Sequence, residues 1–159
     1  MITIALASES HVPQIVELWK ELMDFHAERD PQFATAEDGH VHFEKYLRGL
    51  LQSAEWRVFV ALDGEQVVGY LMAQVAKRPP VMRHRDFGFI SDLAVARSYR
   101  RRRIGQDLLR AAVAWFSERG LRRVEAHVAA RNEVACGFWS AQGFEDYLHT
   151  MRLRLADDA

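Results

Sequence analysis

Four consecutive arginines separate a strand-like segment from a helix-like one, and their chemistry is that of an anion site. Arg100, Arg101, Arg102 and Arg103 follow the β-rich residues 87–95 and precede a helical pattern of apolar residues. The amides of a helix's first turn lack partners within the helix and carry partial positive charge, so they bind phosphate readily. Arginine side chains beside that helix start are unfavourable unless an anion neutralises them. The segment therefore predicts a phosphate-binding loop, with a solvated surface loop and a nucleic-acid patch as the alternatives.

The elements that must hold this loop follow from the spacing of apolar residues. Alternating or β-branched runs predict strands, and apolar residues three or four apart predict helices. These patterns predict, in order, a strand over 1–7, helices over 10–30 and 41–51, strands over 56–62, 66–76 and 87–95, a helix ending at Gly120, a strand over 121–129, a helix over 131–142, and one or two strands over 143–155. This mixture of hairpins and crossovers indicates a mixed α/β sheet with helices on its faces. No repeat or linker interrupts it, so we expect a single domain over residues 1–159.

Composition narrows the classes of protein. Apolar residues make up 49% and charged residues 27% of the chain, a balance typical of globular domains. The 21 basic and 22 acidic side chains give a net charge of −1, so no overall field would recruit nucleic acid or an anionic membrane. Cys136 is the single cysteine, which excludes an intrachain disulfide and a cysteine-based zinc cluster. With no basic leader and no apolar run of about 20 residues, we expect a cytoplasmic protein without a membrane span, and we expect no metal.

Two motifs in fixed order resemble the GNAT superfamily of N-acetyltransferases. The first comprises Leu93-x-Val95, Tyr99-Arg100-x-x-Arg103-x-Gly105 and Leu108-Leu109, and the second comprises Asn132-x-x-Ala135-x-x-Phe138-Trp139-x-x-x-Gly143-Phe144. The family pattern in the loop is Arg or Gln, two residues, Gly, one residue, and Gly or Ala, so Arg103 stands at the first glycine. The resemblance covers nearly the whole chain and implies the GNAT fold. That fold is mixed α/β, with a central, mostly antiparallel, twisted sheet of about seven strands, a splayed central strand pair and about four flanking helices.

The same resemblance implies acetyl-CoA as cosubstrate and assigns it a site. In such enzymes the strand over 87–95 separates from the strand over 121–129, and the pantetheine arm enters the opening and pairs with free strand amides. The implied contacts are Leu93, Ala94 and Val95 for the arm and the acetyl carbonyl, Arg100, Arg101, Arg102, Arg103, Ile104, Gly105 and Gln106 for the pyrophosphate, and Asn132, Ala135, Phe138 and Trp139 for the other side of the arm.

Transfer to an amine calls for a proton acceptor, because an alkyl ammonium with a pKa of about 10.4 is almost fully protonated at neutral pH. His127 precedes the second motif by five residues, where some relatives place a glutamate base, and an imidazole titrates in the right range. A structural histidine that hydrogen-bonds across the strand is the alternative. Asp92 is the second candidate base, with its side chain expected on the face opposite Leu93, and Glu125 is the third. Trp139 stands where the family often has a tyrosine acid, and an indole cannot supply that proton.

By the resemblance, the acceptor binds near residues 26–40 and 77–86. The first of these segments carries a mildly acidic set that would suit an amine, namely His26, Glu28, Asp30, Phe33, Glu37, Asp38 and His40. The implied function is direct transfer of an acetyl group from acetyl-CoA to a primary amine of a small molecule, peptide or protein in a ternary complex. A noncatalytic coenzyme A-binding or sensor module on the same fold is the alternative. A homodimer is left open, and neither nucleic acid nor membrane is an expected partner.

Overall fold

The computed structural model describes residues 1–157 and shows one mixed sheet. Its strands are β1 (Ile2–Leu6), β2 (Trp56–Asp63), β3 (Gln66–Lys77), β4 (Asp86–Val95) and β5 (Val124–Ala126). They lie in the order β1-β2-β3-β4-β5. Neighbours from β1 to β4 are antiparallel, and β5 runs parallel to β4. The predicted mixed α/β fold with a mostly antiparallel sheet is confirmed.

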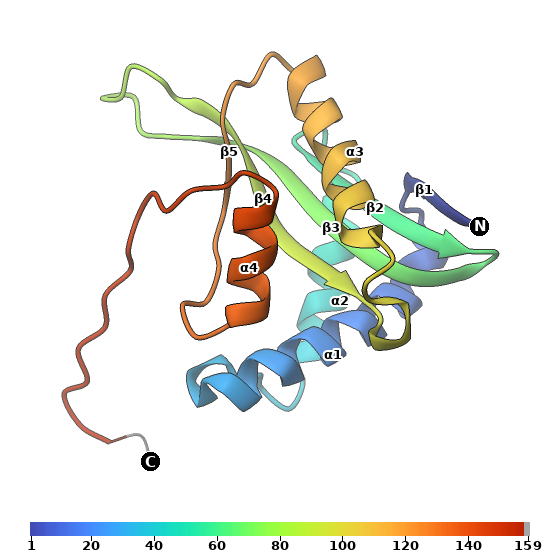
Figure 1. The fold of residues 1–159 in the computed structure, drawn as a ribbon, viewed down its shortest axis with the longest axis horizontal. Helices are drawn as coiled ribbons and strands as arrows, with labels where there is room; N and C mark the ends of the chain where they lie inside the picture. The colour runs from blue at the N-terminus through green and yellow to red at the C-terminus, as the bar shows by residue number, and fades with distance from the viewer. Residues whose placement is uncertain (158–159) are drawn as a thin grey trace.

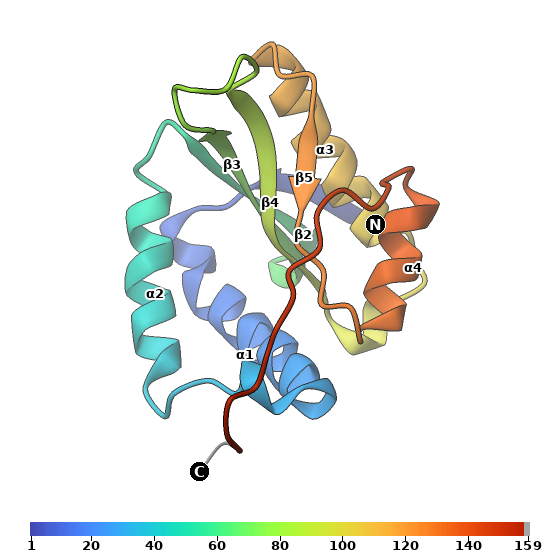
Figure 2. The same ribbon diagram turned by 90° about the vertical axis from the view of Figure 1, so that its left-hand side faces the viewer.

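Four α-helices cover the two faces of the sheet (Figure 2). They are α1 (Val12–Arg29), α2 (Gly39–Leu50), α3 (Ile104–Glu118) and α4 (Glu133–Ala141). The first two lie on one face and the last two on the other. Within the described residues, every helix is too short or too polar to cross a membrane.

Alternation along residues 70–73 of β3 contributes to a core on each face of the sheet. Tyr70 and Met72 are buried in the core beneath α1 and α2, while Leu71 and Ala73 are buried in the core beneath α3. Successive side chains of a strand point to opposite faces, so a strand that is apolar throughout must be covered on both sides. This is why the sheet carries helices on both faces.

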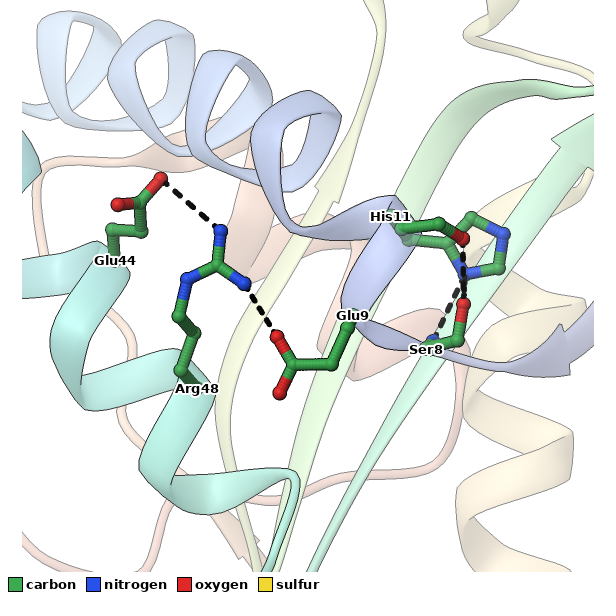
Figure 3. A network of polar contacts seen from close by, with 6 residues as sticks. Ser8, Glu9, His11, Glu44 and Arg48 are labelled. Atoms are coloured by element: carbon green, nitrogen blue, oxygen red, sulfur yellow. Dashed lines mark hydrogen bonds and ion pairs between the residues drawn. The ribbon is translucent and has the colours of Figure 1, made fainter.

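A polar network fastens the start of α1 to α2 (Figure 3). Arg48 of α2 pairs with Glu9, which lies just before α1, and its Nη2 atom is 3.7 Å from Oε1 of Glu44 one turn earlier. The amide of Ser8 donates to Nδ1 of His11 over 3.0 Å. These side chains are partly exposed, so each ion pair contributes at most about 1 kcal/mol, and its main effect is on orientation. The network holds α1 and α2 together as one layer.

β4 and β5 separate after a short stretch of pairing. The register runs from Gly88 opposite Val124 to Ile90 opposite Ala126. Beyond that point β4 continues through residues 91–95, which have no partner on this side within the described chain. The predicted splayed strand pair is therefore confirmed.

A β-bulge in β4 decides which way its side chains face. Met72 of β3 lies opposite Asp92, and the next residue, Ala73, lies opposite Ile90, so Ser91 is the extra residue. A bulge interrupts the alternation of a strand. Ile90 accordingly packs in the core beneath α3, whereas Asp92 hydrogen-bonds into the core beneath α1 and α2.

The one or two strands predicted over residues 143–155 are wrong, so the sheet formed by residues 1–157 has five strands and not about seven. Residues 144–157, called here the tail, contain no helix or strand and lead away from the body of the molecule (Figure 1). Four apolar side chains of the tail are 76% to 92% exposed, namely Leu148, Met151, Leu153 and Leu155. An ion pair of 3.0 Å joins Arg152 to Asp30 at the end of α1. Alternation in a sequence specifies a strand's two faces, but a strand also needs a neighbouring edge, which this pattern does not supply.

Candidate active site

A cleft of about 650 Å³ opens where β4 and β5 separate. Its walls are the unpaired end of β4, the loop and first turn of α3, the residues that follow β5, α4, and the C-terminal half of α1. The predicted site residues that line it are Asp92, Leu93, Ala94, Val95, Arg100, Arg101, Arg103, Ile104, Gly105, Gln106, His127, Asn132, Ala135, Phe138 and Trp139. Of the residues that the resemblance assigns to acetyl-CoA, Arg102 alone does not line it. The fold thus gathers segments that are far apart in the sequence.

The end of β4 presents its backbone to the cleft. Ala94 is buried in the core beneath α1, while Leu93 and Val95 pack against the core beneath α3. Both faces of the strand are therefore held, and its free edge is fixed in place. Backbone amides and carbonyls on such an edge need hydrogen bonds from water or from a ligand.

The loop before α3 contains two residues in the left-handed backbone conformation. Arg101 has φ 66° and Arg103 has φ 62°, and Arg103 caps the start of α3. A residue with a Cβ adopts this conformation at a cost of about 1 to 2 kcal/mol, which explains why the family pattern has glycine where Arg103 stands. Arg103 therefore adopts the backbone conformation that a glycine would adopt at this position. The amides of Ile104, Gly105 and Gln106 follow it and form the first turn of α3 beside the cleft.

The four arginines are not equivalent. The guanidinium of Arg100 lies 5.4 Å from the ring of Phe25 on α1, at the rim of the cleft. The guanidinium of Arg102 lies 5.0 Å from the ring of Tyr99 and takes no part in the lining. The Tyr99 hydroxyl donates to Oδ2 of Asp63 over 2.6 Å, and this hydrogen bond raises the pKa of Tyr99. It also anchors the loop to the end of β2.

Helix α4 supplies an apolar wall opposite the loop. Asn132 is 4% exposed, and its side chain accepts a 3.0 Å hydrogen bond from the amide of Ala135, so it caps α4. A Cβ on Gly105 would lie 3.3 Å from Cε2 of Phe138, which shows how closely α3 and α4 approach. Trp139 meets Phe138 edge-on at 5.1 Å between ring centroids. Trp139 thus packs in the wall of the cleft.

His127 lies beyond the end of β5. The strand predicted over 121–129 stops at Ala126, so His127 is not paired across the sheet. Its ring is exposed and meets Phe89 edge-on, with the ring centroids 4.9 Å apart. Glu125 points elsewhere, because its carboxylate forms an ion pair with Arg78. Of these two residues, only His127 faces the cleft.

Asp92 lies on the other side of the cleft and is held from within the core. The hydroxyl of Tyr70 donates to Oδ2 of Asp92 over 3.0 Å. Burial raises the pKa of Asp92, while hydrogen bonds from Tyr70 and Ser91 act in the opposite direction. Among the described residues, no cationic side chain is paired with this carboxyl. Asp92 is thus a largely desolvated carboxyl group that lines the cleft without a counterion.

The acceptor segments predicted over 26–40 and 77–86 contribute one residue, His26, to the cleft. Burial lowers the pKa of His26, and the charge of Arg29 adds to that effect. Asp30 instead accepts a hydrogen bond from the amide of Gln32 and forms an ion pair with Arg152 of the tail.

The cleft is also lined by residues that the sequence did not assign to the site. They are Leu18, Glu21, Leu22, Met23, Phe25, Ile90, Ser91, Tyr99, Val128, Ala129, Val134 and Gln142. The spacing of Leu18, Leu22 and Phe25 indicates an inward face of a helix, but not that part of this face borders a cleft.

Solved structures with the same fold cover nearly the whole chain. A mutant of the BH1408 protein from Bacillus halodurans has 21% identity and a TM-score of 0.88, over 96% of this chain and 99% of that one. AAC(6')-Iy in complex with the bisubstrate analog CoA-S-monomethyl-acetylneamine has 19% identity and a TM-score of 0.76, over 99% of both chains. A transcriptional regulator from Bacillus halodurans C-125 has 19% identity and a TM-score of 0.77, over 98% of this chain and 100% of that one. At these identities the likeness establishes the fold.

Sequence comparison assigns the family. A search of curated proteins found no match. Residues 15–144, however, match the family described as the acetyltransferase (GNAT) family. This match runs from α1 through α4 and includes every segment that lines the cleft. The chain therefore belongs to the acetyltransferase (GNAT) family.

Proposed function

We propose that the protein is an N-acetyltransferase, a single catalytic domain over residues 1–159 that moves an acetyl group from acetyl-CoA to a primary amine. The observation that carries the proposal is the junction of two features in one cleft. An unpaired strand edge, residues 91–95 of β4, leads to a basic loop and the first turn of α3. A strand edge suits an extended amide chain, and a helix start with arginines suits a pyrophosphate.

The residues present fit acetyl-CoA. We propose that the β4 edge hydrogen-bonds the pantetheine arm, and that the first-turn amides together with Arg101 and Arg103 bind the pyrophosphate. The ring of Phe138 packs close to Gly105 and gives the cleft an apolar surface beside the first turn of α3. When bound, acetyl-CoA supplies an activated thioester.

Direct transfer requires the chain to accept one proton from the incoming ammonium. We propose Asp92 for this role, because it lines the cleft without a cationic partner and its raised pKa makes it a stronger base than an ordinary carboxylate. The amine nitrogen then forms the new bond to the acetyl carbon while the carbon–sulfur bond breaks. A second proton leaves that nitrogen and ends on the departing sulfur. His127 is the second candidate, supported by its place at the opposite side of the same cleft.

The acceptor is proposed to be a small-molecule amine, with a peptide or protein amine as the alternative. AAC(6')-Iy carries an aminoglycoside-derived bisubstrate analog, which supports a small amine here only by likeness of fold. A second hollow of about 410 Å³ adjoins the cleft and is lined by Glu21, Asp24, Phe25, Glu28, Arg97 and Arg100. Its three carboxylates would attract a cationic acceptor toward α1.

Two measurements test this function. Saturating acetyl-CoA should raise the melting temperature, because a ligand that binds only the folded state stabilises it. An acetylation screen over amines and peptides should then yield turnover with at least one acceptor class. Acetyl-CoA binding without turnover of any acceptor would favour the noncatalytic coenzyme A-binding module, and an unchanged melting temperature would contradict both.

We also propose a homodimer in the cytoplasm. Cys136 as the single cysteine supports a reducing compartment. Two features support the dimer. The apolar side chains of the tail are exposed and alternate as in a strand. Among the described residues, β5 has an unpaired outer edge, to which the tail of a second copy could add as a strand. Five large exposed side chains of the tail, Tyr147, Leu148, Met151, Leu153 and Leu155, would bury about 100 Å² each. Two exchanged tails would thus bury about 1,000 Å² before the covered edges are counted, which approaches the size of a stable interface.

A further inference from the structure

Tyr70 carries a hydroxyl group in a place where packing does not require one. Its side chain is fully buried among the apolar residues of the core beneath α1 and α2. A buried hydroxyl is costly unless it forms a hydrogen bond, and a phenylalanine would fill the same volume without that cost. The hydroxyl donates to Oδ2 of Asp92 over 3.0 Å. The one polar atom of this side chain is therefore directed at a carboxyl group in the cleft wall.

The sheet geometry accounts for this contact. Tyr70 lies opposite Ala94 and Met72 lies opposite Asp92, so Tyr70 and Asp92 are diagonal neighbours on adjacent strands. A diagonal pair lies within reach of a long aromatic side chain. The contact also depends on the bulge at Ser91, which turns Asp92 to the face where Tyr70 lies. Two separate features, a bulge on β4 and a phenol on β3, thus converge on one carboxyl group.

The surroundings of Asp92 contain few other polar groups. Ser91 on β4 contributes a hydrogen bond. Burial raises the pKa of Tyr46 on α2, and the nearby charge of Asp92 adds to that effect. His26 on α1 lines the same cleft. With burial opposing its ionised form, Asp92 relies on Tyr70 and Ser91 for stabilisation of its negative charge.

We propose that Tyr70 is a positioning residue for acetyl transfer, whose hydroxyl holds the Asp92 carboxylate in the orientation that receives a proton from the acceptor amine. The inference rests on the proposed function. It goes further in assigning a catalytic purpose to a residue of the sheet interior that does not line the cleft. Tyr70 touches neither cosubstrate nor acceptor and acts through Asp92 alone.

The test compares Tyr70→Phe with the matched control Tyr46→Phe, which removes a phenol on α2 that makes no hydrogen bond to Asp92. Titration of the Asp92 carboxyl by ¹³C NMR requires no acceptor and reports the contact directly. In Tyr70→Phe the pKa of Asp92 should rise, because a hydrogen bond to the charged form has been lost. The acid limb of the kcat/KM profile should move to higher pH by the same amount, and kcat should fall about tenfold with the KM for acetyl-CoA unchanged. Tyr46→Phe should leave the acid limb and kcat close to wild type.

An unchanged Asp92 titration and an unchanged acid limb in folded Tyr70→Phe would overturn the inference. A second measurement covers the case in which that variant does not fold. The Tyr70 hydroxyl proton should resonate far downfield in the wild-type protein and shift markedly upfield in Asp92→Asn, and no shift would equally overturn the inference. Failure of the proposed function is distinguishable, because acetyl-CoA would then fail to bind, or no acceptor would be turned over, in the wild-type protein itself.

Discussion

Arg103 holds a backbone conformation that glycine adopts without strain. Its φ of 62° caps α3 at the point where the loop turns into the helix, and Arg101 repeats the conformation two residues earlier. The loop therefore combines a backbone path that favours glycine with two additional positive charges at the start of α3. Strain of this kind persists where the surrounding structure imposes it.

Arg103→Gly should stabilise the fold and weaken cosubstrate binding. Relief of the left-handed strain should raise the free energy of unfolding by about 1 kcal/mol, measured by urea denaturation. Loss of the guanidinium should lower acetyl-CoA affinity and reduce its dependence on salt, measured by calorimetry at two ionic strengths. Arg102→Gly is the control, since Arg102 has no positive φ and lies outside the cleft. A gain in stability for Arg102→Gly as large as that for Arg103→Gly would contradict the assignment of strain to position 103.

Asp92→Asn should separate activity from stability. As a base, Asp92 must be ionised, so kcat/KM should rise with pH through a pKa above the ordinary aspartate value, and Asp92→Asn should lower kcat about 10²-fold. Because the folded-state pKa is raised, ionisation of Asp92 destabilises the fold as pH rises from the unfolded pKa through the folded one. Asp92→Asn should therefore raise the melting temperature at neutral pH, and this gain should disappear in acid below both pKa values.

The contrasting variant is His127→Ala. If Asp92 is the base, His127→Ala should keep the acid limb of the pH profile and most of the turnover, because His127 is exposed beyond β5. If His127→Ala loses the acid limb of the pH profile while Asp92→Asn stays fully active, the general base is His127 and not Asp92.

At the scale of elements, the separation of β4 from β5 creates the site. The strands over 56–62, 66–76 and 87–95 could be predicted, because their alternation and the turn between the first two are local properties of the sequence. The loop and α4 could be placed through the family motifs. Simple alternation back from Leu93 predicts the face of Asp92 correctly. The bulge at Ser91, which places Ile90 on the same face as Leu93, could not be predicted, because it depends on how β4 pairs with β3. The contribution of α1 to the cleft could not be predicted either, because an apolar helix face has the same sequence pattern whether it packs against a core or borders a ligand site.

Gly105→Val should damage the junction of α3 with α4. A Cβ at this position would already lie 3.3 Å from the Phe138 ring, so the branched side chain would force α3 and α4 apart. Acetyl-CoA affinity should fall about tenfold or more, measured by calorimetry. Gly137→Ala in α4 is the control, because a Cβ there meets no atom within 4 Å, and it should leave affinity unchanged. Equal affinity in the two variants would show that close packing at Gly105 does not matter for the cosubstrate.

At the scale of the whole molecule, the tail is the part that the sequence pattern predicted least well. Its alternating apolar residues are those of a strand, yet it lies extended with those side chains in solvent. A local pattern specifies that a segment can pair, but the identity of the partner edge is a property of the assembly.

Leu153→Asp should disrupt the proposed dimer. The substitution places a charge on a tail side chain that is 83% exposed in the single chain, so the protomer should stay folded while the exchanged interface is lost. Sedimentation velocity should show a dimer for the wild-type protein and a monomer for Leu153→Asp. Val41→Asp, at a 57% exposed position on α2, should remain dimeric. A monomeric wild-type protein across the micromolar range would reject the dimer.

The direction in which the tail leaves the body has a practical consequence for how the protein is prepared. In the described part of the chain, β1 lies at one edge of the sheet and the tail leads away from it beyond α4 (Figure 1). If the tail pairs with a second copy as proposed, a purification tag fused beyond it would lie beside the pairing segment and obstruct that contact by bulk alone. A tag placed before β1 would leave the tail free. Recombinant material with the two tag positions should thus differ in hydrodynamic size and in its tendency to precipitate, although the folded domain is the same.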